Sequence, residues 1–224
     1  MKRTNHFLPN TPTSQNELLK HIVFHEAGHV VAIYLRNQQQ QLPPVFFQII
    51  INKEQQKQCA YFAQVLGGRL IDNLPVAEIE NNYIGSIEEQ KSLQKAYEAD
   101  VINLLMGPLA EAKYVALRDC EIFNDQLIDI RALKNYGGHS DLEQAYRYLE
   151  YFIPNAYERE KKISELYAKA FHFVNKPNNW KCIQSFANYL LNNEQTIISC
   201  EQASDVLEPF LVSWMRYNFA MALV

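Results

Sequence analysis

The stretch Ile22-Val23-Phe24-His25-Glu26-Ala27-Gly28-His29-Val30-Val31-Ala32-Ile33 carries an H-E-x-x-H motif inside an apolar run with helical spacing. Residues four apart share one face of a helix, so the two imidazoles point the same way. Two imidazoles on one face can hold one zinc ion, and Glu26 is placed to take the proton of a zinc-bound water. The motif therefore predicts a metallopeptidase site. The rival interpretation is that hydrogen bonds within the core satisfy both histidines.

The motif lies in a well-signalled helix. Residues 11–14 break the chain before it, and Ser14 with Glu17 has the spacing of a capping box. Apolar residues then recur at helical intervals until the polar run 37–41 begins. We predict the active-site helix over about residues 14–36.

Composition narrows the class of protein. With 224 residues, 48% of them hydrophobic, the chain can bury a proper core, and we expect one domain over residues 1–224. The net charge of -4 argues against nucleic acid as a partner. The four cysteines form no C-x-x-C pair, and we expect them to be reduced thiols of a cytoplasmic protein. The sequence shows no signal peptide, no apolar run of membrane-spanning length and no P-loop, so we expect no membrane insertion.

The rest of the chain predicts a mainly α fold with a small β element beside the active-site helix. Residues 45–51 and 58–65 are rich in β-forming residues, and they predict a hairpin or small sheet over about residues 45–66. Helical spacing returns over residues 87–216, with a kink or break expected at Gly107-Pro108 and a second capping box at Ser140 and Glu143. The other expected helices cover about residues 157–174, 180–192 and 200–214.

A catalytic zinc ion usually has three protein ligands, so a third ligand must come from farther along the chain. The remaining candidates are His139, His172, Glu111 and Asp141. Asp141 opens an expected helix, where the helix dipole favours a carboxylate, but aspartate is also ordinary in a first turn. Glu111 lies in an apolar stretch, where it would serve as a ligand or would orient His25 or His29. The residues alone leave this choice open.

Four segments in order resemble the peptidase domain of FtsH-type proteases. Residues 25–35 resemble the zinc helix of that family, with H-E-A-G-H followed by small and apolar residues. Residues 106–112 resemble its G-R-A-A-E-E segment, and residues 137–145 its G-A-x-N-D-L-x-x-A segment. Residues 194–201 resemble its E-T-I-x-x-x-E stretch. The first and third segments are specific, and the likeness covers about residues 21–207.

The resemblance implies a zincin-like helical metallopeptidase domain that binds Zn2+ through His25, His29 and Asp141. It implies that Glu26 is the catalytic residue and that Glu111 lies in the second shell. The chain departs from the family pattern in three places. Pro108 replaces an arginine, Ser140 replaces an asparagine, and His139 adds a titratable group of unassigned role.

The predicted function is that of a cytoplasmic zinc metalloendopeptidase, ATP-independent by itself, that cleaves flexible or unfolded polypeptide. Residues 45–51 are expected to offer the strand edge on which an extended substrate adds. The family's ATPase domain and membrane anchor have no counterpart in this sequence, so a separate ATPase or a homo-oligomer is an expected partner. The first alternative is a non-catalytic or regulatory zinc-binding relative that binds peptides or protein partners. The second is an interaction module without metal.

Overall fold

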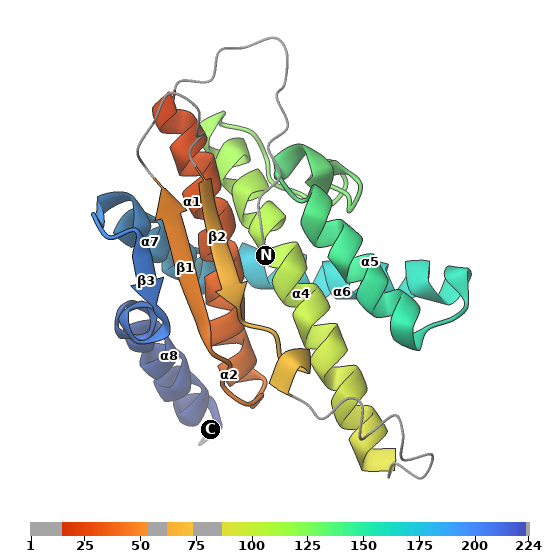
Figure 1. Ribbon diagram of the computed structural model, residues 1–224. Coiled ribbons are helices and arrows are strands. Elements are labelled where there is room, and N and C mark those ends of the chain that lie inside the picture. The colour runs from red at the N-terminus through yellow and green to blue at the C-terminus, as the bar shows by residue number, and fades with distance from the viewer. Residues whose placement is uncertain (1–14, 53–61, 74–86, 223–224) are drawn as a thin grey trace.

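Helix α1 (Gln15–Val31) runs through the centre of the molecule, and every residue from 22 to 33 is buried (Figure 1). The computed structural model describes residues 15–52, 62–73 and 87–222, so Ser14 and its expected cap lie outside the described residues. Helix α4 (Ile87–Arg118), helix α7 (Pro177–Asn192) and strand β2 (Phe62–Gly67) contact α1 and cover this buried segment.

Helical structure continues past the expected end of this element. A π-helical turn, η1 (Ala32–Arg36), leads into the short helix α2 (Asn37–Gln39), and Gln41 then adopts a positive φ of 53°. Leu35 and Asn37 are buried in this extension. Tertiary packing therefore extends the helix into a polar run that by itself predicts a loop.

Three antiparallel strands form one small sheet in the order β2-β1-β3. They are β1 (Phe47–Asn52), β2 (Phe62–Gly67) and β3 (Ile197–Ser199), and Ile49 pairs with both Val65 and Ile198. The expected β element over residues 45–66 is confirmed. The expectation that residues 45–51 form an open edge is wrong, because β1 is the central strand. Strand β3 has three residues, too few for a recognisable alternation in the sequence.

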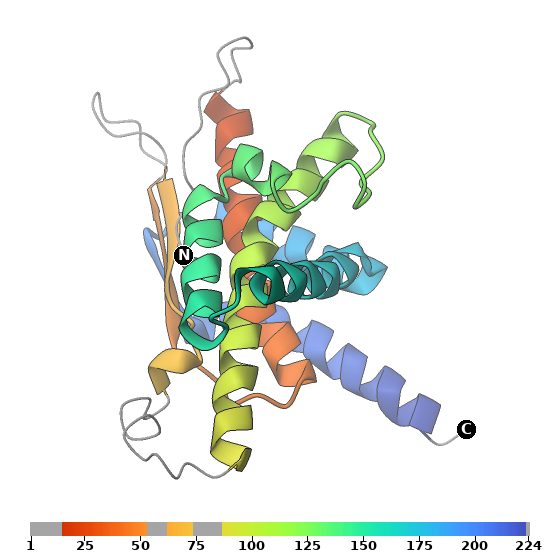
Figure 2. The ribbon, with the colours of Figure 1, turned by 90° about the vertical axis from the view of Figure 1, so that its right-hand side faces the viewer.

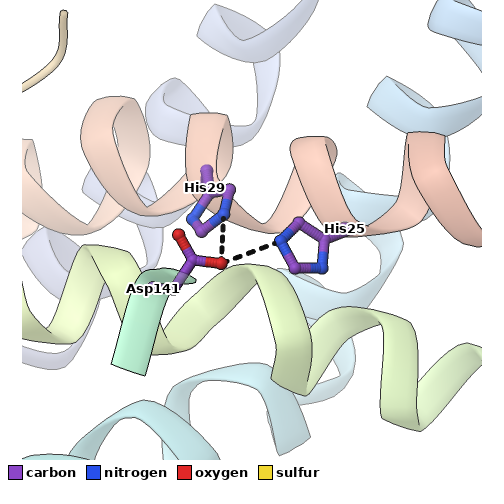
Figure 3. A group of neighbouring side chains, drawn as sticks. All are labelled: His25, His29 and Asp141. Atoms are coloured by element: carbon purple, nitrogen blue, oxygen red, sulfur yellow. Dashed lines mark hydrogen bonds and ion pairs between the residues drawn. The ribbon is translucent and has the colours of Figure 1, made fainter. Parts of the chain in front are cut away.

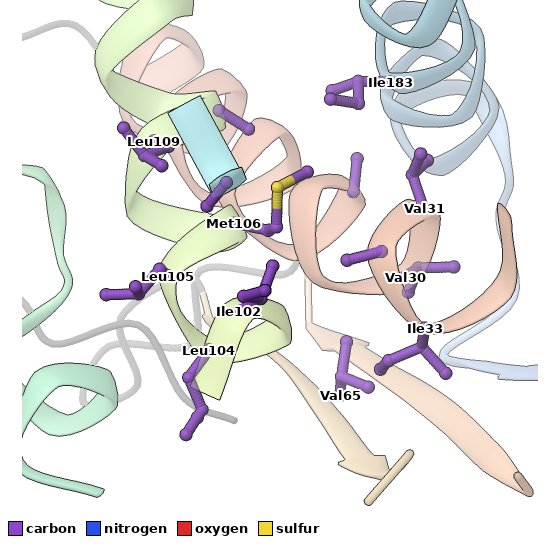
Figure 4. Packing of buried hydrophobic residues seen from close by; sticks show 14 of the residues in the cluster. Val30, Val31, Ile33, Val65, Ile102, Leu104, Leu105, Met106, Leu109 and Ile183 are labelled. Carbon is purple, nitrogen blue, oxygen red and sulfur yellow. The ribbon is translucent and has the colours of Figure 1, made fainter. Parts of the chain in front are cut away.

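Helix α4 (Ile87–Arg118) crosses α1 and runs without interruption through Pro108. Of the kink or break expected at Gly107-Pro108, the break is therefore wrong. A proline inside a helix costs about 3 kcal/mol. The buried side chains on both sides of it, among them Leu104, Leu105 and Leu109, offset that cost because each removes apolar surface from water. In Figure 4, Ile102 and Met106 lie on the side of α4 that faces Val30, and Leu105 and Leu109 lie on its other side.

Helices α6 (Ala156–Asn175) and α8 (Cys200–Ala222) lie on the side of α1 away from the sheet (Figure 2). After the short 3-10 helices η2 (Ile71–Asn73) and η3 (Ala132–Tyr136) come four long helices. They are α5 (His139–Phe152), α6 (Ala156–Asn175), α7 (Pro177–Asn192) and α8 (Cys200–Ala222). The mainly α class is confirmed. Across the described ranges, no helix has the length and apolar character that crossing a bilayer requires.

The start of α5 differs from the expected capping box. The N-cap residue is Gly138, which has no side chain that could cap the helix. Ser140, the expected N-cap residue, already lies inside the helix. A side chain at Gly138 would have no room, because a Cβ there would come within 2.7 Å of Pro108. The missing side chain of Gly138 therefore lets the start of α5 pack closely on Pro108 of α4. Asp141 is placed in the first turn of α5.

Candidate metal centre

Two glycines let α1 and α4 cross at close range. A Cβ on Gly28 would collide with the Met106 carbonyl oxygen and come within 2.7 Å of the Ala110 Cβ. A Cβ on Gly107 would overlap the His29 imidazole at Nε2. Because Gly107 has no side chain, the His29 ring can occupy this space.

His25, His29 and Asp141 converge at this crossing (Figure 3). The Asp141 Oδ2 atom lies 3.1 Å from His25 Nε2 and 3.6 Å from His29 Nε2. One ligand atom from each residue lies within 4.8 Å of the other two, and all three side chains are at most 1% exposed. The structure thus brings together the three residues that the sequence and the resemblance single out.

The hydrogen bonds of the two rings indicate which nitrogen carries the proton. His25 Nδ1 faces the Tyr136 carbonyl oxygen at 3.1 Å, and His29 Nδ1 faces the Asn103 carbonyl oxygen at 2.8 Å. Carbonyl oxygens only accept hydrogen bonds, so we assign a proton to each Nδ1. In the neutral rings that a metal requires, both Nε2 lone pairs then face the Asp141 carboxylate. In the metal-free cluster, a protonated His25 donates from Nε2 to Asp141 Oδ2 at 3.1 Å. Three electron-donating atoms turned toward one another in a buried site suit a shared cation.

The electrostatics of the cluster also favour a bound cation. Burial alone would lower the pKa of His25, but the hydrogen bonds to Asp141 and Glu111 raise it to about 9. Burial alone would raise the pKa of Asp141, but the neighbouring His29 and His25 hold it well below its usual range. The cluster therefore favours positive charge between the rings and an ionised carboxylate beside it.

Glu26 is buried next to the cluster, against strand β2. Its Oε2 atom accepts a 3.0 Å hydrogen bond from the Val65 backbone N–H. Its Oε1 atom is buried with no hydrogen-bond partner in the described structure. Desolvation raises the pKa of this carboxyl. These features leave one oxygen fixed and the other without a hydrogen bond.

The other candidate ligands lie outside the cluster. Glu111 is buried on α4, and its Oε2 atom lies 3.2 Å from His25 Nδ1, on the side of the ring away from Asp141. This position matches the second-shell role that the resemblance implies. His139 and His172 are exposed and do not belong to the cluster.

In the described structure, three further residues contact the cluster or Glu111 and were not singled out from the sequence. His21 Nδ1 lies 3.2 Å from Glu111 Oε1, and a helical spacing of four before His25 is a signal that was open to inspection. Asn103 and Tyr136 contribute backbone carbonyls, which every residue has. No sequence pattern could have identified those two.

Comparison of the chain with protein-family models, with curated proteins and with solved structures gave no match in any of the three. The chemistry of the buried cluster therefore carries the functional argument.

Proposed function

We propose that this protein is a zinc-dependent endopeptidase with a zincin-like site, acting on flexible or unfolded polypeptide. The observation that carries the proposal is the convergence of His25 Nε2, His29 Nε2 and Asp141 Oδ2 beside a buried glutamate on the same helix. Without metal, the same cluster would be satisfied by a proton that His25 Nε2 donates to Asp141, so zinc content separates the two interpretations.

The donor set fits zinc. Two imidazole nitrogens and one carboxylate oxygen, with a position left for water, are the ligands of many catalytic zinc sites. Zinc held there would polarise the scissile carbonyl and acidify its bound water. The carbonyls of Asn103 and Tyr136 and the Glu111 carboxylate would keep the rings in the ligating tautomer.

Glu26 has the features expected of a general base. Desolvation raises its pKa, so it holds a proton more readily than an ordinary glutamate, as suits a group that takes up a proton. The hydrogen bond from Val65 holds one oxygen, so the other oxygen is the one that would exchange a proton with water and then with the leaving amine.

Among the described strands, β2 is the outer strand next to α1, and it replaces β1 as the proposed docking edge. Gly68 N donates to Phe46 O, so the alternation of an antiparallel pair turns the backbone groups of residues 63, 65 and 67 away from β1. The Val65 N–H on that outer side reaches Glu26. A peptide adding to this edge would pass beside the proposed base, and its backbone rather than its sequence would provide most of the binding.

A second candidate function is a non-catalytic zinc-binding protein that binds peptides or protein partners. The observation that favours it is burial, because His25, Glu26 and His29 are all 0% exposed. Catalysis would require an opening that admits a peptide and water. Glu26 argues for the first candidate, since a purely structural zinc site does not need a buried carboxylate beside its ligands.

The test compares a permanently unfolded polypeptide with a stably folded protein as substrates, without nucleotide, using protein of measured zinc content. We expect cleavage of the unfolded substrate alone, and loss of cleavage when a chelator removes the zinc. Zinc binding without cleavage of either substrate would favour the second candidate. Absence of stoichiometric zinc after reconstitution would refute both.

A further inference from the structure

We infer that His21 is a positioning residue of the metal centre and acts on His25 through Glu111. The inference rests on the proposed metal site. It assigns a role to a histidine that is not itself near the three ligand atoms. Its basis is a continuous string, that is, a series of three hydrogen bonds, from the partly exposed Arg118 to the buried proposed ligand His25.

The string has three links. Arg118 Nη1 lies 2.7 Å from His21 Nε2. His21 Nδ1 lies 3.2 Å from Glu111 Oε1. The other oxygen of Glu111 lies 3.2 Å from His25 Nδ1. The side chain of Arg118 is 33% exposed and that of His25 is 0% exposed, so the string connects the surface to the site.

The direction of each link follows from the chemistry of the groups. A guanidinium only donates, so His21 Nε2 must accept from Arg118. The proton of the His21 ring is then on Nδ1 and is donated to Glu111. His25 also donates from Nδ1, toward Glu111 and the Tyr136 carbonyl. Glu111 thus accepts from two histidines, one on each oxygen.

The surroundings hold this arrangement in place. The His21 ring meets the edge of Tyr114 at a centroid distance of 5.7 Å, and the Tyr114 hydroxyl donates to Glu17. Arg118 also donates to Asp119 at 2.7 Å and lies 3.8 Å from Glu17. Each group therefore has little freedom to turn away from its partner.

Removing the His21 donor would take one hydrogen bond from a carboxylate that is 1% exposed. A buried carboxylate that loses a donor rotates toward its remaining donors. This rotation weakens the hydrogen bond from His25 Nδ1 to Glu111, and so changes the direction in which His25 Nε2 faces the metal position. Outer partners of metal-binding histidines typically change metal affinity by about 10- to 100-fold. We expect a zinc affinity about tenfold weaker.

The experiment measures zinc Kd by chelator competition in the full chain. His21→Phe keeps a ring beside Tyr114 but has no donor, and His21→Leu is a second donor-free variant in case the first does not fold. His21→Asn retains a side-chain N–H near the position of Nδ1. His172→Phe is the matched control, because His172 is exposed on α6 away from the cluster. We expect a weaker Kd for the donor-free variants, recovery in His21→Asn, and no change in the control.

A double-mutant cycle tests the route through Glu111. If His21 acts through that carboxylate, His21→Phe should weaken zinc binding much less in a Glu111→Gln background than in the wild type. Equal zinc affinity of the wild type and both donor-free variants would overturn the inference and leave the proposed function standing. A wild type that binds no zinc would instead overturn the proposed function itself. Metal-free thermal unfolding of each variant separates loss of affinity from loss of fold.

Discussion

The backbone N–H of Val65 donates a 3.0 Å hydrogen bond to the Glu26 carboxylate, which ties the outer strand β2 to the motif helix. The strand follows the helix by more than thirty positions in sequence, and the polar link between them is buried. Any movement of this strand edge would therefore also move the proposed base. Binding of a peptide along the edge and proton transfer at Glu26 are expected to be coupled.

Zinc should bind once per chain and should stabilise the fold. At a free zinc concentration about a thousand times the Kd, binding adds about 4 kcal/mol to the free energy of unfolding. For a chain of this size that raises Tm by roughly 8–16 °C. Asp141→Asn should abolish most of this shift, and Asp205→Asn, exposed on α8, should retain it. Elemental analysis and thermal unfolding with and without zinc provide the measurement. An unchanged shift in Asp141→Asn would remove that ligand from the site.

Glu26→Gln should lower kcat by about 100- to 10,000-fold while zinc content and fold stay intact. Glutamine keeps an oxygen that can accept from the Val65 N–H but cannot take up a proton. Steady-state cleavage of an unfolded substrate measures the effect. Glu143→Gln, the same change on the exposed side of α5, serves as the control. Near wild-type turnover in Glu26→Gln would refute the proposed role of this carboxylate.

Gly107→Ala should damage the metal centre directly. The added Cβ would overlap the His29 ring at Nε2, so the ring must shift away from the position where it faces Asp141. Overpacking of this kind typically costs about 1–3 kcal/mol of stability. We expect zinc affinity to fall as well, measured by chelator competition. Gly28→Ala is the comparison, because its Cβ would meet the α4 backbone and Ala110 rather than a ligand. Equal zinc affinities of the wild type and Gly107→Ala would contradict the close crossing described here.

Asp100 should make stability depend on pH. Its carboxylate is buried and accepts the backbone N–H groups of Leu70 and Ile71, just after β2. Burial raises its pKa from 3.8 to about 7, against those two hydrogen bonds. The folded state thus holds a proton that the unfolded chain releases. The contribution of this group is therefore most favourable below pH 4 and is lost as pH rises toward 7, by roughly 4 kcal/mol.

The measurement for Asp100 is the free energy of unfolding from pH 4 to pH 8 for the wild type and for Asp100→Asn. The amide does not titrate, so the stability of the wild type relative to the variant should fall as pH rises. Other titrating groups are common to both proteins and cancel in the difference. A difference that stays constant across this range would show that Asp100 ionises normally in the folded state.

Much of the architecture could be read from local patterns. The apolar run around residues 22–33 predicts a buried helix, and the β-rich residues 45–51 predict a strand, because side-chain periodicity acts over a few neighbours. Errors arose where distant segments compete with local preference. The helix continues through Pro108 because α1 and α5 pack against it, and β1 lies in the sheet interior because residues 197–199 pair with it.

The sequence by itself determined that His25 and His29 share one helix face with Glu26 beside them, since helical spacing is local geometry. Only the tertiary structure decided that Asp141 rather than Glu111 lies against both Nε2 atoms, because this choice depends on how α4 and α5 pack against α1. It also decided that Glu26 meets Val65 and that His21 reaches the site through Glu111. Contacts between residues far apart in sequence follow from packing of whole elements, and no short stretch of sequence records that packing.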